Sequence, residues 1–417
     1  RGLQRAVLER PSTILCPCPQ TGTMTIAAPI ANSLQRASWI RQMFEAGARL
    51  KQQYGADQVF DFSLGNPILE PPPKVHETLH ALLDDPAPGN HRYMPNGGFT
   101  AVREYLASEL KEEQDLPFVT ADVVLCVGAG GGMNVVAKAL LEPGDEVVAL
   151  APYFVEYGFY VQNHGGVLTV ARTRQEDFLP DLEALEAVMT PKTRAIIVNS
   201  PNNPTGVVYS QEVLDDLGSW LRTQEQRFGR PIYLIADEPY RKLLFDEVTN
   251  GSVLKAHPHS ILITSHSKDL GLAGERIGYI ALHPEVPDRV LWQEALVFTN
   301  RILGFVNAPA LMQRALPHLR GVQVDIGFYQ QLRDQICGLM EDVGISCVRP
   351  QGAFYLFPQS LEDDDVAFVR RAQEEKILLV PGSGFGWPGC FRLSYCCPSS
   401  VIENSREAWL RLVESYC

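Results

Sequence analysis

The sequence predicts an α/β protein: a large domain with a mostly parallel seven-stranded sheet flanked by helices, and a smaller α+β domain after it. Three observations predict this fold class. Short runs rich in Val, Ile and Leu alternate with helical stretches between Val119 and Tyr279. Several of these runs are almost continuously apolar, as expected for strands that are buried on both faces. The alternation changes after Leu311, where a long helix and several short strands follow.

Seven apolar runs, separated by turn residues and helical stretches, are the expected strands of the large domain. They are Val123–Val127, Glu146–Ala149, Val167–Val170, Ala195–Val198, Ile232–Ala236, Ile261–Thr264 and Ile277–Ala281. The helices expected between them include Met133–Leu141, Leu182–Met189 and Glu212–Gln226. Because strands and helices alternate, most of the strands are expected to run parallel.

The two flanking regions have different patterns. Before the first strand of the sheet, apolar residues spaced three and four apart predict a helix from Asn32 to about Tyr54, and a short strand follows at Val59–Leu64. After Leu311 we expect a helix through Met340, a helix at Val366–Lys376, and strands near Val348 and at Ala353–Phe357, Ile377–Val380 and Phe391–Tyr395. The predicted division is a disordered lead (1–23), an N-terminal arm and helix packing with the small domain (24–58), a large domain (59–310) and a small domain (311–417).

Composition excludes several classes of protein. The 417 residues carry 36 Lys and Arg against 49 Asp and Glu, a formal net charge of −13, which argues against a nucleic-acid-binding protein. No apolar run approaches the roughly 20 residues of a membrane span. The nine cysteines form no CxxC pair, and residues 1–23 lack the continuous apolar stretch of a secretory signal. We therefore expect a cytoplasmic protein with free thiols.

A glycine-rich segment follows the first predicted strand of the sheet. Gly128-Ala-Gly-Gly-Gly-Met133 opens a helix, where backbone N–H groups and the helix dipole favour a phosphate. The Lys-Ser/Thr of a P-loop is absent, and Met133 replaces the third small residue of the dinucleotide fingerprint. The segment therefore indicates a phosphate site more than a nucleotide site, with tight packing as the alternative.

Further polar segments follow other predicted strands, at the edge of the sheet where ligands bind in open α/β folds. They are Ser200-Pro-Asn-Asn-Pro-Thr-Gly206, Asp237-Glu-Pro-Tyr240 and Ser265-His-Ser-Lys268, with Arg276 eight residues after the lysine. Arg392 lies in a late strand, opposite in face to Phe391 and Leu393. Taken singly, each segment has a simpler alternative. These are a turn for 200–206, a helix cap for Asp237, a solvated surface position for Lys268 and a solvated strand face for Arg392.

In this order, the segments resemble the pyridoxal-phosphate-dependent class I and II aminotransferases of fold type I, from about Asn32 to the C-terminus. The resemblance implies that Lys268 forms the Schiff base with pyridoxal 5′-phosphate. It implies that Asp237 faces the pyridine nitrogen and that Asn203 and Tyr240 donate to the ring hydroxyl oxygen. Phe154 takes the place of the aromatic residue that stacks on the ring.

The same resemblance implies a phosphate cup and a shared active site. Arg276, Ser265 and the backbone at Ala129 and Gly130 match the residues that hold the phosphate. Tyr93 matches a tyrosine that reaches the phosphate of the neighbouring subunit, which implies a homodimer.

On the substrate side, Arg392 matches the clamp for the α-carboxylate, and Gly65 lines the pocket beside Asn203. Tyr157 stands where some relatives place a histidine behind the aspartate, and its role is left open. Arg301 is a candidate for binding a second carboxylate, with a surface or interface position as the alternative.

The implied reaction is ping-pong transamination between an L-amino acid, neutral, aromatic or aspartate-like, and a 2-oxo acid. The alternatives on the same fold are a C–S lyase, a decarboxylase, a racemase or a cyclopropane-forming synthase. A dinucleotide-dependent oxidoreductase also suits the α/β pattern but leaves Lys268 and Asp237 unexplained. No metal site is expected, because the nine histidines are scattered along the sequence.

Overall fold

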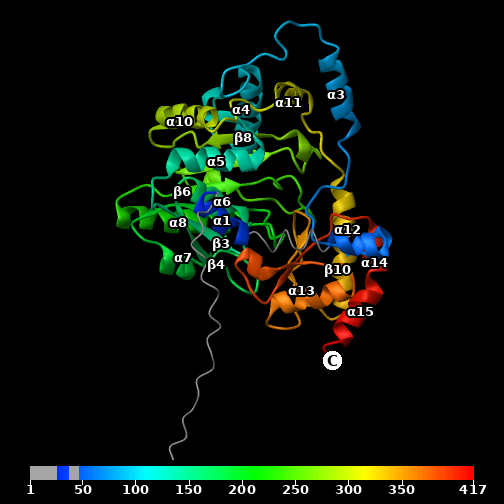
Figure 1. Ribbon diagram of the computed structural model, residues 1–417. Helices are drawn as coiled ribbons and strands as arrows, with labels where there is room; N and C mark the ends of the chain where they lie inside the picture. The colour runs from blue at the N-terminus through cyan, green and yellow to red at the C-terminus, as the bar shows by residue number, and fades with distance from the viewer. Residues whose placement is uncertain (1–25, 37–46) are drawn as a thin grey trace, which may run out of the picture. The chain divides into compact units, whose positions relative to one another are not determined.

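The computed structural model describes residues 26–36 and 47–417 (Figure 1). The chain divides into two units, Arg1–Trp39 and Ile40–Cys417. The first unit contains helix α1 (Ala28–Arg36). The predicted lead at 1–23 and the middle of the predicted helix at 32–54 lie outside the described residues. The parts of that predicted helix that the structure describes are residues 32–36, within α1, and residues 47–54. Both are helical as predicted.

The second unit is built on a seven-stranded sheet with the strand order β2-β8-β7-β6-β5-β3-β4. The strands are β2 (Val123–Val127), β3 (Glu146–Ala151), β4 (Val167–Arg172), β5 (Thr193–Val198), β6 (Tyr233–Asp237), β7 (Ser260–Ser265) and β8 (Ile277–Leu282). Neighbouring strands are parallel except for β8, which is antiparallel to both β2 and β7. The predicted seven-stranded, mostly parallel α/β fold is confirmed.

Helices cover both faces of this sheet, so its central strands are buried on both sides. In β6, Leu234 and Ala236 join one apolar cluster, whereas Tyr233 and Ile235 join the other. The first cluster includes residues of α4 (Thr100–Gln114), α7 (Leu182–Val188) and α8 (Gln211–Phe228). The second includes residues of α5 (Gly128–Leu140), α6 (Glu156–Asn163) and α10 (Arg289–Ile302). This double burial explains why the strands read as continuous apolar runs.

The C-terminal part forms a third apolar cluster around short strands. Strands β11 (Val380–Pro381), β12 (Phe391–Ser394) and β9 (Tyr355–Leu356) form an antiparallel sheet. Strand β1 (Phe60–Asp61) pairs in parallel with β10 (Ile377–Leu378). Phe62 then packs among the C-terminal residues, with its ring centroid 6.4 Å from that of Trp409. An early segment of the chain therefore completes the C-terminal cluster, and the predicted domain boundaries stay a prediction.

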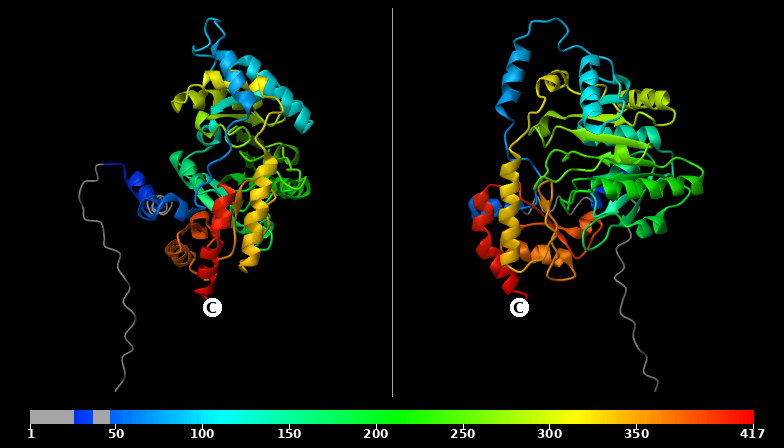
Figure 2. Two further views of the ribbon diagram at one scale, coloured as in Figure 1. Left: turned by 90° about the vertical axis from the view of Figure 1, so that its right-hand side faces the viewer. Right: turned by 180° about the vertical axis from the view of Figure 1, so that it is seen from behind.

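The helices of this part are α12 (Ile326–Asp342), α13 (Asp365–Glu374), α14 (Ser399–Asn404) and α15 (Arg406–Glu414). Figure 2 shows α12 and α15, in yellow and red, side by side in both views. The single helix predicted from about residue 311 through Met340 is wrong. The structure has α11 (Ala310–Ala315) and α12 there, because Gly321 adopts a positive φ of 71° between them and Asp325 caps the start of α12.

Two smaller differences concern strand lengths. The predicted strand Val59–Leu64 is shorter in the structure, where it is β1, and residues around Val348 form no strand. The remaining described elements are helices α3 (Pro73–Leu83) and α9 (Val253–Ala256) and five short 3₁₀ helices at Ala56–Gln58, Thr120–Asp122, Ala273–Glu275, Leu316–His318 and Gly382–Phe385. None of the helices in the described ranges has the length and apolar composition that a membrane crossing requires.

Candidate active site

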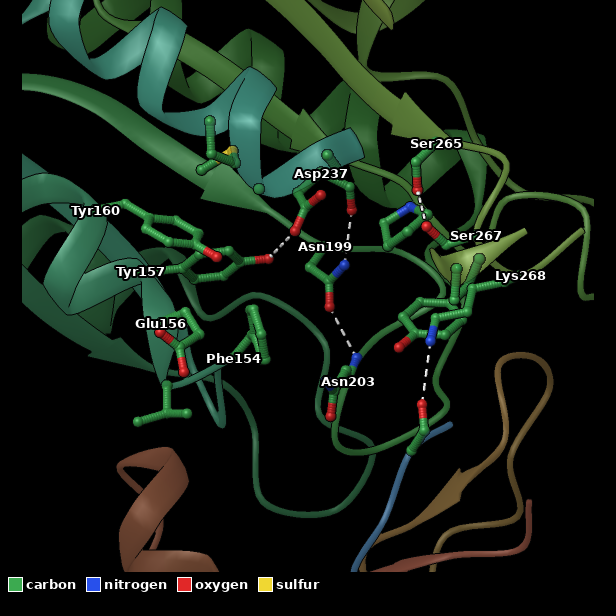
Figure 3. Close-up of a pocket in the computed structure, with 18 of the residues that line it drawn as sticks. Phe154, Glu156, Tyr157, Tyr160, Asn199, Asn203, Asp237, Ser265, Ser267 and Lys268 are labelled. Atoms are coloured by element: carbon green, nitrogen blue, oxygen red, sulfur yellow. Dashed lines mark hydrogen bonds between the residues drawn. The ribbon is translucent and has the colours of Figure 1, made fainter. Parts of the chain in front are cut away.

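A cavity of about 370 Å³ lies at the carboxyl edge of the seven-stranded sheet (Figure 3). Residues at or just after the carboxyl ends of four strands line it. Ala129 follows β2, Phe154 follows β3, Asp237 is the last residue of β6, and Ser265 is the last residue of β7. Because parallel strands all end at one edge, residues far apart in the sequence meet there.

The predicted site residues converge on this cavity. Eleven of the twelve line it: Gly65, Ala129, Gly130, Phe154, Asn203, Asp237, Tyr240, Ser265, Lys268, Arg276 and Arg392. Tyr93 lies outside it, with 90% of its surface exposed. The predicted reach of Tyr93 into a neighbouring subunit stays a prediction.

Asp237 is a buried carboxylate with one unused oxygen. Its Oδ2 accepts a hydrogen bond of 2.6 Å from the Tyr157 hydroxyl, and its backbone oxygen accepts one of 2.7 Å from Asn199 Nδ2. Its Oδ1 is buried and has no hydrogen-bond partner among the described residues. Burial raises the pKa of Asp237 to about 6, and the hydrogen bond from Tyr157 opposes that shift. A buried carboxylate of this kind requires a cationic or N–H partner in the cavity.

Lys268 is a buried amine without an acidic partner. Its Nζ donates to the backbone oxygen of Gly65 at 3.1 Å. Burial lowers its pKa from 10.5 to about 8, with further lowering by Arg276 and Arg392 and an opposing contribution from Cys396. The lowered pKa increases the fraction of neutral amine at neutral pH. Lys268 is therefore a nucleophile and proton acceptor near neutral pH.

Arg392 lines the cavity, and the hydrogen-bond partners of its guanidinium in the described chain are not acidic. Its Nη1 donates to Asn203 Oδ1 at 3.2 Å and its Nη2 to the Ser63 backbone oxygen at 2.8 Å. The rings of Tyr355 and Phe385 lie 4.8 and 4.9 Å from its central carbon. Its Nε is buried and unpartnered. These contacts fix the orientation of a cation that can receive a carboxylate.

The start of α5 and Arg276 form a second anion-binding region of the cavity. The first backbone N–H groups of α5 have no carbonyl partner within the helix and coincide with the positive end of its dipole. Gly128 has a φ of 66°, and a Cβ there would lie 2.5 Å from Arg276 Nη2. The Arg276 side chain donates to the Ala273 backbone oxygen at 3.0 Å. The absence of a side chain at 128 thus lets a guanidinium approach the helix start, as a phosphate site requires.

Among the lining residues that were not predicted from the sequence, three form hydrogen bonds with predicted ones. Asn199 links two predicted residues, because its Nδ2 donates to Asp237 and its Oδ1 accepts from the Asn203 backbone N–H at 2.8 Å. The Tyr355 and Tyr240 hydroxyls are 2.9 Å apart. Ser267 Oγ accepts from Ser265 Oγ at 3.1 Å. Asn199 directly precedes one of the segments singled out in the sequence, and Ser267 lies within another. The position of Tyr355 depends on pairing between β9 and β12, which no local sequence pattern indicates.

The two residues left open by the sequence lie in different surroundings. Tyr157 is buried beside Asp237, so it occupies the position behind the aspartate. Its ring packs edge-on against Phe154, with centroids 5.6 Å apart. Arg301 does not line the cavity; its guanidinium lies 5.4 Å from the centre of the Phe298 ring.

Comparison with known proteins gives consistent results. The family described as "Aminotransferase class I and II" matches residues 57–408. The chain is 32% identical to an aspartate aminotransferase of Geobacillus stearothermophilus, over 86% of this chain and 92% of that one. It is 30% identical to an aspartate/prephenate aminotransferase of Thermus thermophilus, over 87% and 92% of the two chains.

Solved structures agree with this result. An aminotransferase from Eubacterium rectale superposes with a TM-score of 0.92 at 35% identity, covering 94% of this chain and 99% of that one. The aspartate aminotransferase of Thermus thermophilus with maleate superposes with a TM-score of 0.79 at 28% identity, covering 91% and 98%.

Proposed function

Since the chain belongs to the class I and II aminotransferases, we propose specific roles for the side chains of its cavity. The protein is an enzyme that transfers an amino group from an amino acid to a 2-oxo acid with pyridoxal 5′-phosphate as cofactor. The relatives are named as aminotransferases, which favours this reaction over lyase, decarboxylase, racemase or synthase chemistry on the same fold.

The residues present fit this cofactor. The helix start at Gly128 with the nearby guanidinium of Arg276 suits the phosphate. The unpartnered Oδ1 of Asp237 suits a protonated ring nitrogen, and Lys268 is a buried amine of lowered pKa that suits the aldehyde. Phe154 lines the same cavity and offers an aromatic face.

When bound, the cofactor supplies an electron-withdrawing ring that stabilises negative charge on the substrate's α-carbon. We assign Lys268 Nζ to hold the aldehyde and, once an amino substrate has displaced it, to accept the proton that leaves the α-carbon. Asp237 keeps a proton on the ring nitrogen by presenting a negative charge to it. Tyr157 holds the Asp237 carboxylate in place through its 2.6 Å hydrogen bond.

Two further roles concern orientation. Arg392 binds the α-carboxylate of the substrate, because it is a cavity-facing cation with an unused Nε. Asn203 and Tyr240 supply an amide and a hydroxyl for the ring hydroxyl oxygen of the cofactor. Their present partners, Arg392 and Tyr355, hold both groups in the cavity.

The cavity favours amino donors with a single carboxylate. The cationic side chains that line it in the described ranges are Lys268, Arg276 and Arg392, and the first two are assigned to the cofactor. Glu156 also lines the cavity, so a second substrate carboxylate would meet an acidic side chain. We therefore propose neutral or aromatic amino donors, whereas the names of the relatives point to aspartate. A panel of amino donors with a common 2-oxo acid distinguishes the two, since a higher kcat/KM for aspartate would contradict this assignment.

A homodimer with shared active sites is part of the proposal. It is supported by Tyr93, an aromatic side chain that is 90% exposed in the single chain. Subunit mixing tests it: Lys268→Ala and Tyr93→Ala homodimers are each expected to have low activity, and mixed dimers are expected to regain one intact site. Unchanged activity after mixing would contradict sharing. We also propose a cytoplasmic enzyme, because the seven described cysteines are unpaired.

One observation carries the assignment of the site: a buried lysine of lowered pKa and a buried aspartate with a free oxygen line one cavity. The test is transamination by Lys268→Ala with purified, folded protein. We expect no turnover, because the variant lacks the proton acceptor. Turnover close to that of the unmodified enzyme would refute the assignment.

A further inference from the structure

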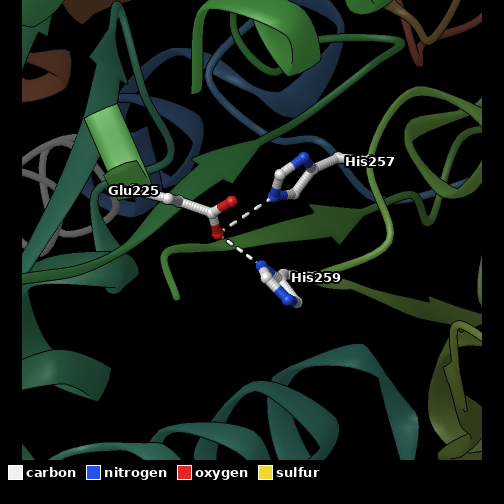
Figure 4. Close-up of side chains that lie close together, drawn as sticks. All are labelled: Glu225, His257 and His259. Atoms are coloured by element: carbon white, nitrogen blue, oxygen red, sulfur yellow. Dashed lines mark hydrogen bonds and ion pairs between the residues drawn. The ribbon is translucent and has the colours of Figure 1, made fainter. Parts of the chain in front are cut away.

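A cluster of three side chains that can bind metals, one glutamate and two histidines, lies away from the active site (Figure 4). Glu225 belongs to the last turn of α8, His257 directly follows α9, and His259 directly precedes β7. Their ligand atoms, a carboxylate oxygen and two imidazole nitrogens, all lie within 4.8 Å of one another. Figure 4 shows both rings directed at the carboxylate from one side.

The hydrogen bonding of Glu225 is unevenly distributed. Its Oε1 accepts from the Ile232 backbone N–H at 2.8 Å, from His257 Nε2 at 3.3 Å and from His259 Nδ1. A carboxylate oxygen has two lone pairs for these three donors, whereas Oε2 accepts no hydrogen bond in the described chain. The two ring nitrogens are therefore directed at one oxygen that has fewer lone pairs than donors. A cation placed between the carboxylate and the two rings would have a ligand atom from each of the three side chains within reach.

The backbone holds the three side chains in position. His257 is extended, with φ −150° and ψ 131°, so the side chains at 257 and 259 project to the same side. The His257 backbone oxygen accepts from Ser260 Oγ at 2.6 Å, and the His259 backbone oxygen accepts from Leu234 N at 2.9 Å. A site on fixed backbone segments loses little conformational entropy when it binds a metal.

Access to the site also suits a divalent cation. The side chain of His257 is fully buried, whereas those of Glu225 and His259 are 13% and 18% exposed. The site thus has a buried side and an open side at which water can complete the coordination.

We propose that Glu225, His257 and His259 form a zinc site. Imidazole and carboxylate groups are the ligands that Zn²⁺ takes in proteins, and three such ligands leave one position for water. His257 Nδ1 is buried and has no hydrogen-bond partner among the residues that the structure describes, so none of these residues supports this ligand. We therefore expect an affinity roughly 10- to 100-fold below that of sites whose histidines are so supported.

The zinc site is separate from the catalytic cavity. His259 stands before the first residue of β7, and Lys268 follows its end; a six-residue strand spans about 20 Å. A metal at this position joins the end of α8 to the segment that enters β7. Its expected effect is therefore on the stability of the fold and not on the chemical step.

The test uses the full chain with its cofactor bound, freed of metal by a chelator and then titrated with Zn²⁺ against a chromophoric zinc indicator. We expect one zinc ion per chain and a higher thermal unfolding temperature with zinc than without. In His259→Gln, a partly exposed position, we expect zinc affinity to fall by at least about 10-fold while transaminase activity is kept. His76→Gln, an exposed histidine on α3, is the matched control and is expected to bind zinc normally.

Glu225→Gln keeps a hydrogen-bond acceptor for both histidines but removes the charge, and it is expected to lose zinc binding with little change in metal-free stability. Cobalt substitution gives a second measurement: Co²⁺ in this site is expected to show the intense visible absorption of a four-coordinate ion, absent from His259→Gln. The proposal is wrong if the unmodified chain binds no stoichiometric zinc, or if His259→Gln and His76→Gln bind it equally.

Discussion

The hydrogen bond between Tyr157 and Asp237 makes a quantitative prediction for Tyr157→Phe. The substitution removes the hydroxyl that donates to Asp237 Oδ2 at 2.6 Å and keeps the buried ring. A hydrogen bond to a charged group contributes about 1.5–3 kcal/mol, which corresponds to roughly one to two pKa units. Because the bond stabilises the ionised carboxylate, its loss raises the pKa of Asp237 from about 6 to roughly 7–8.

The consequence is a pH-dependent loss of cofactor affinity. If the ionised Asp237 is the form that binds the ring nitrogen, about nine-tenths of the carboxylate is competent at pH 7 in the unmodified enzyme. In Tyr157→Phe the competent fraction falls to between about a tenth and a half, so affinity at pH 7 falls roughly 2- to 10-fold. Near pH 9 both proteins are ionised, and the difference is expected to vanish.

The assay is titration of the cofactor-free protein with pyridoxal 5′-phosphate at a series of pH values. Tyr160→Phe is the matched control, because Tyr160 lines the same cavity but its hydroxyl makes no hydrogen bond in the described chain. In the plot of cofactor affinity against pH, we expect the acid limb to move upward by one to two pH units in Tyr157→Phe. In Tyr160→Phe we expect it to stay at the pH found for the unmodified enzyme. Equal movement in both variants, or none in Tyr157→Phe, would refute the role given to this hydrogen bond.

Three further predictions concern single positions. Arg392→Lys removes the bidentate donor to the α-carboxylate, so kcat/KM for amino acids is expected to fall roughly 10- to 150-fold, whereas kcat/KM for amines without a carboxylate is affected much less. Equal losses for amino acids and amines would contradict the assignment. Gly128→Ala places a Cβ 2.5 Å from Arg276 Nη2 at a φ of 66°, so weaker cofactor binding and a lower unfolding temperature are expected. Gly338→Ala, in α12 with open space around it, is the control and is expected to keep cofactor affinity and to unfold at the same or a slightly higher temperature. Because the pKa of Lys268 is lowered to about 8, the neutral amine increases as pH rises toward 8, and the rate of cofactor capture by the cofactor-free protein is expected to level off above about pH 8; a rise continuing to pH 10 would mean an ordinary lysine.

Much of the fold was predictable because its signals are local. Strands such as β6 and β7 are buried along their whole length, so each is an apolar run bounded by turn residues. The carboxyl ends of parallel strands share one edge, and this rule alone places Asp237 and Ser265 together. Identification of the site needed the conjunction of several weak motifs, since Lys268 alone is indistinguishable in sequence from a surface lysine.

What was not predictable depends on contacts between distant segments. Tyr355 reaches the cavity because β9 pairs with β12, and Phe62 joins the C-terminal cluster because β1 pairs with β10. The break before α12 depends on a glycine with positive φ and an aspartate cap, which a periodic apolar pattern does not register. The scattered histidines argued against a metal site, yet the end of α8 brings Glu225 beside two of them.

The central claim is that Lys268 holds the cofactor opposite Asp237. Its most direct test is to reduce the cofactor-loaded enzyme with borohydride, digest it and locate the phosphopyridoxyl group by peptide mass spectrometry. We predict one modified residue per chain, in the peptide that contains Lys268. Modification of a different lysine, or of none, would contradict the account.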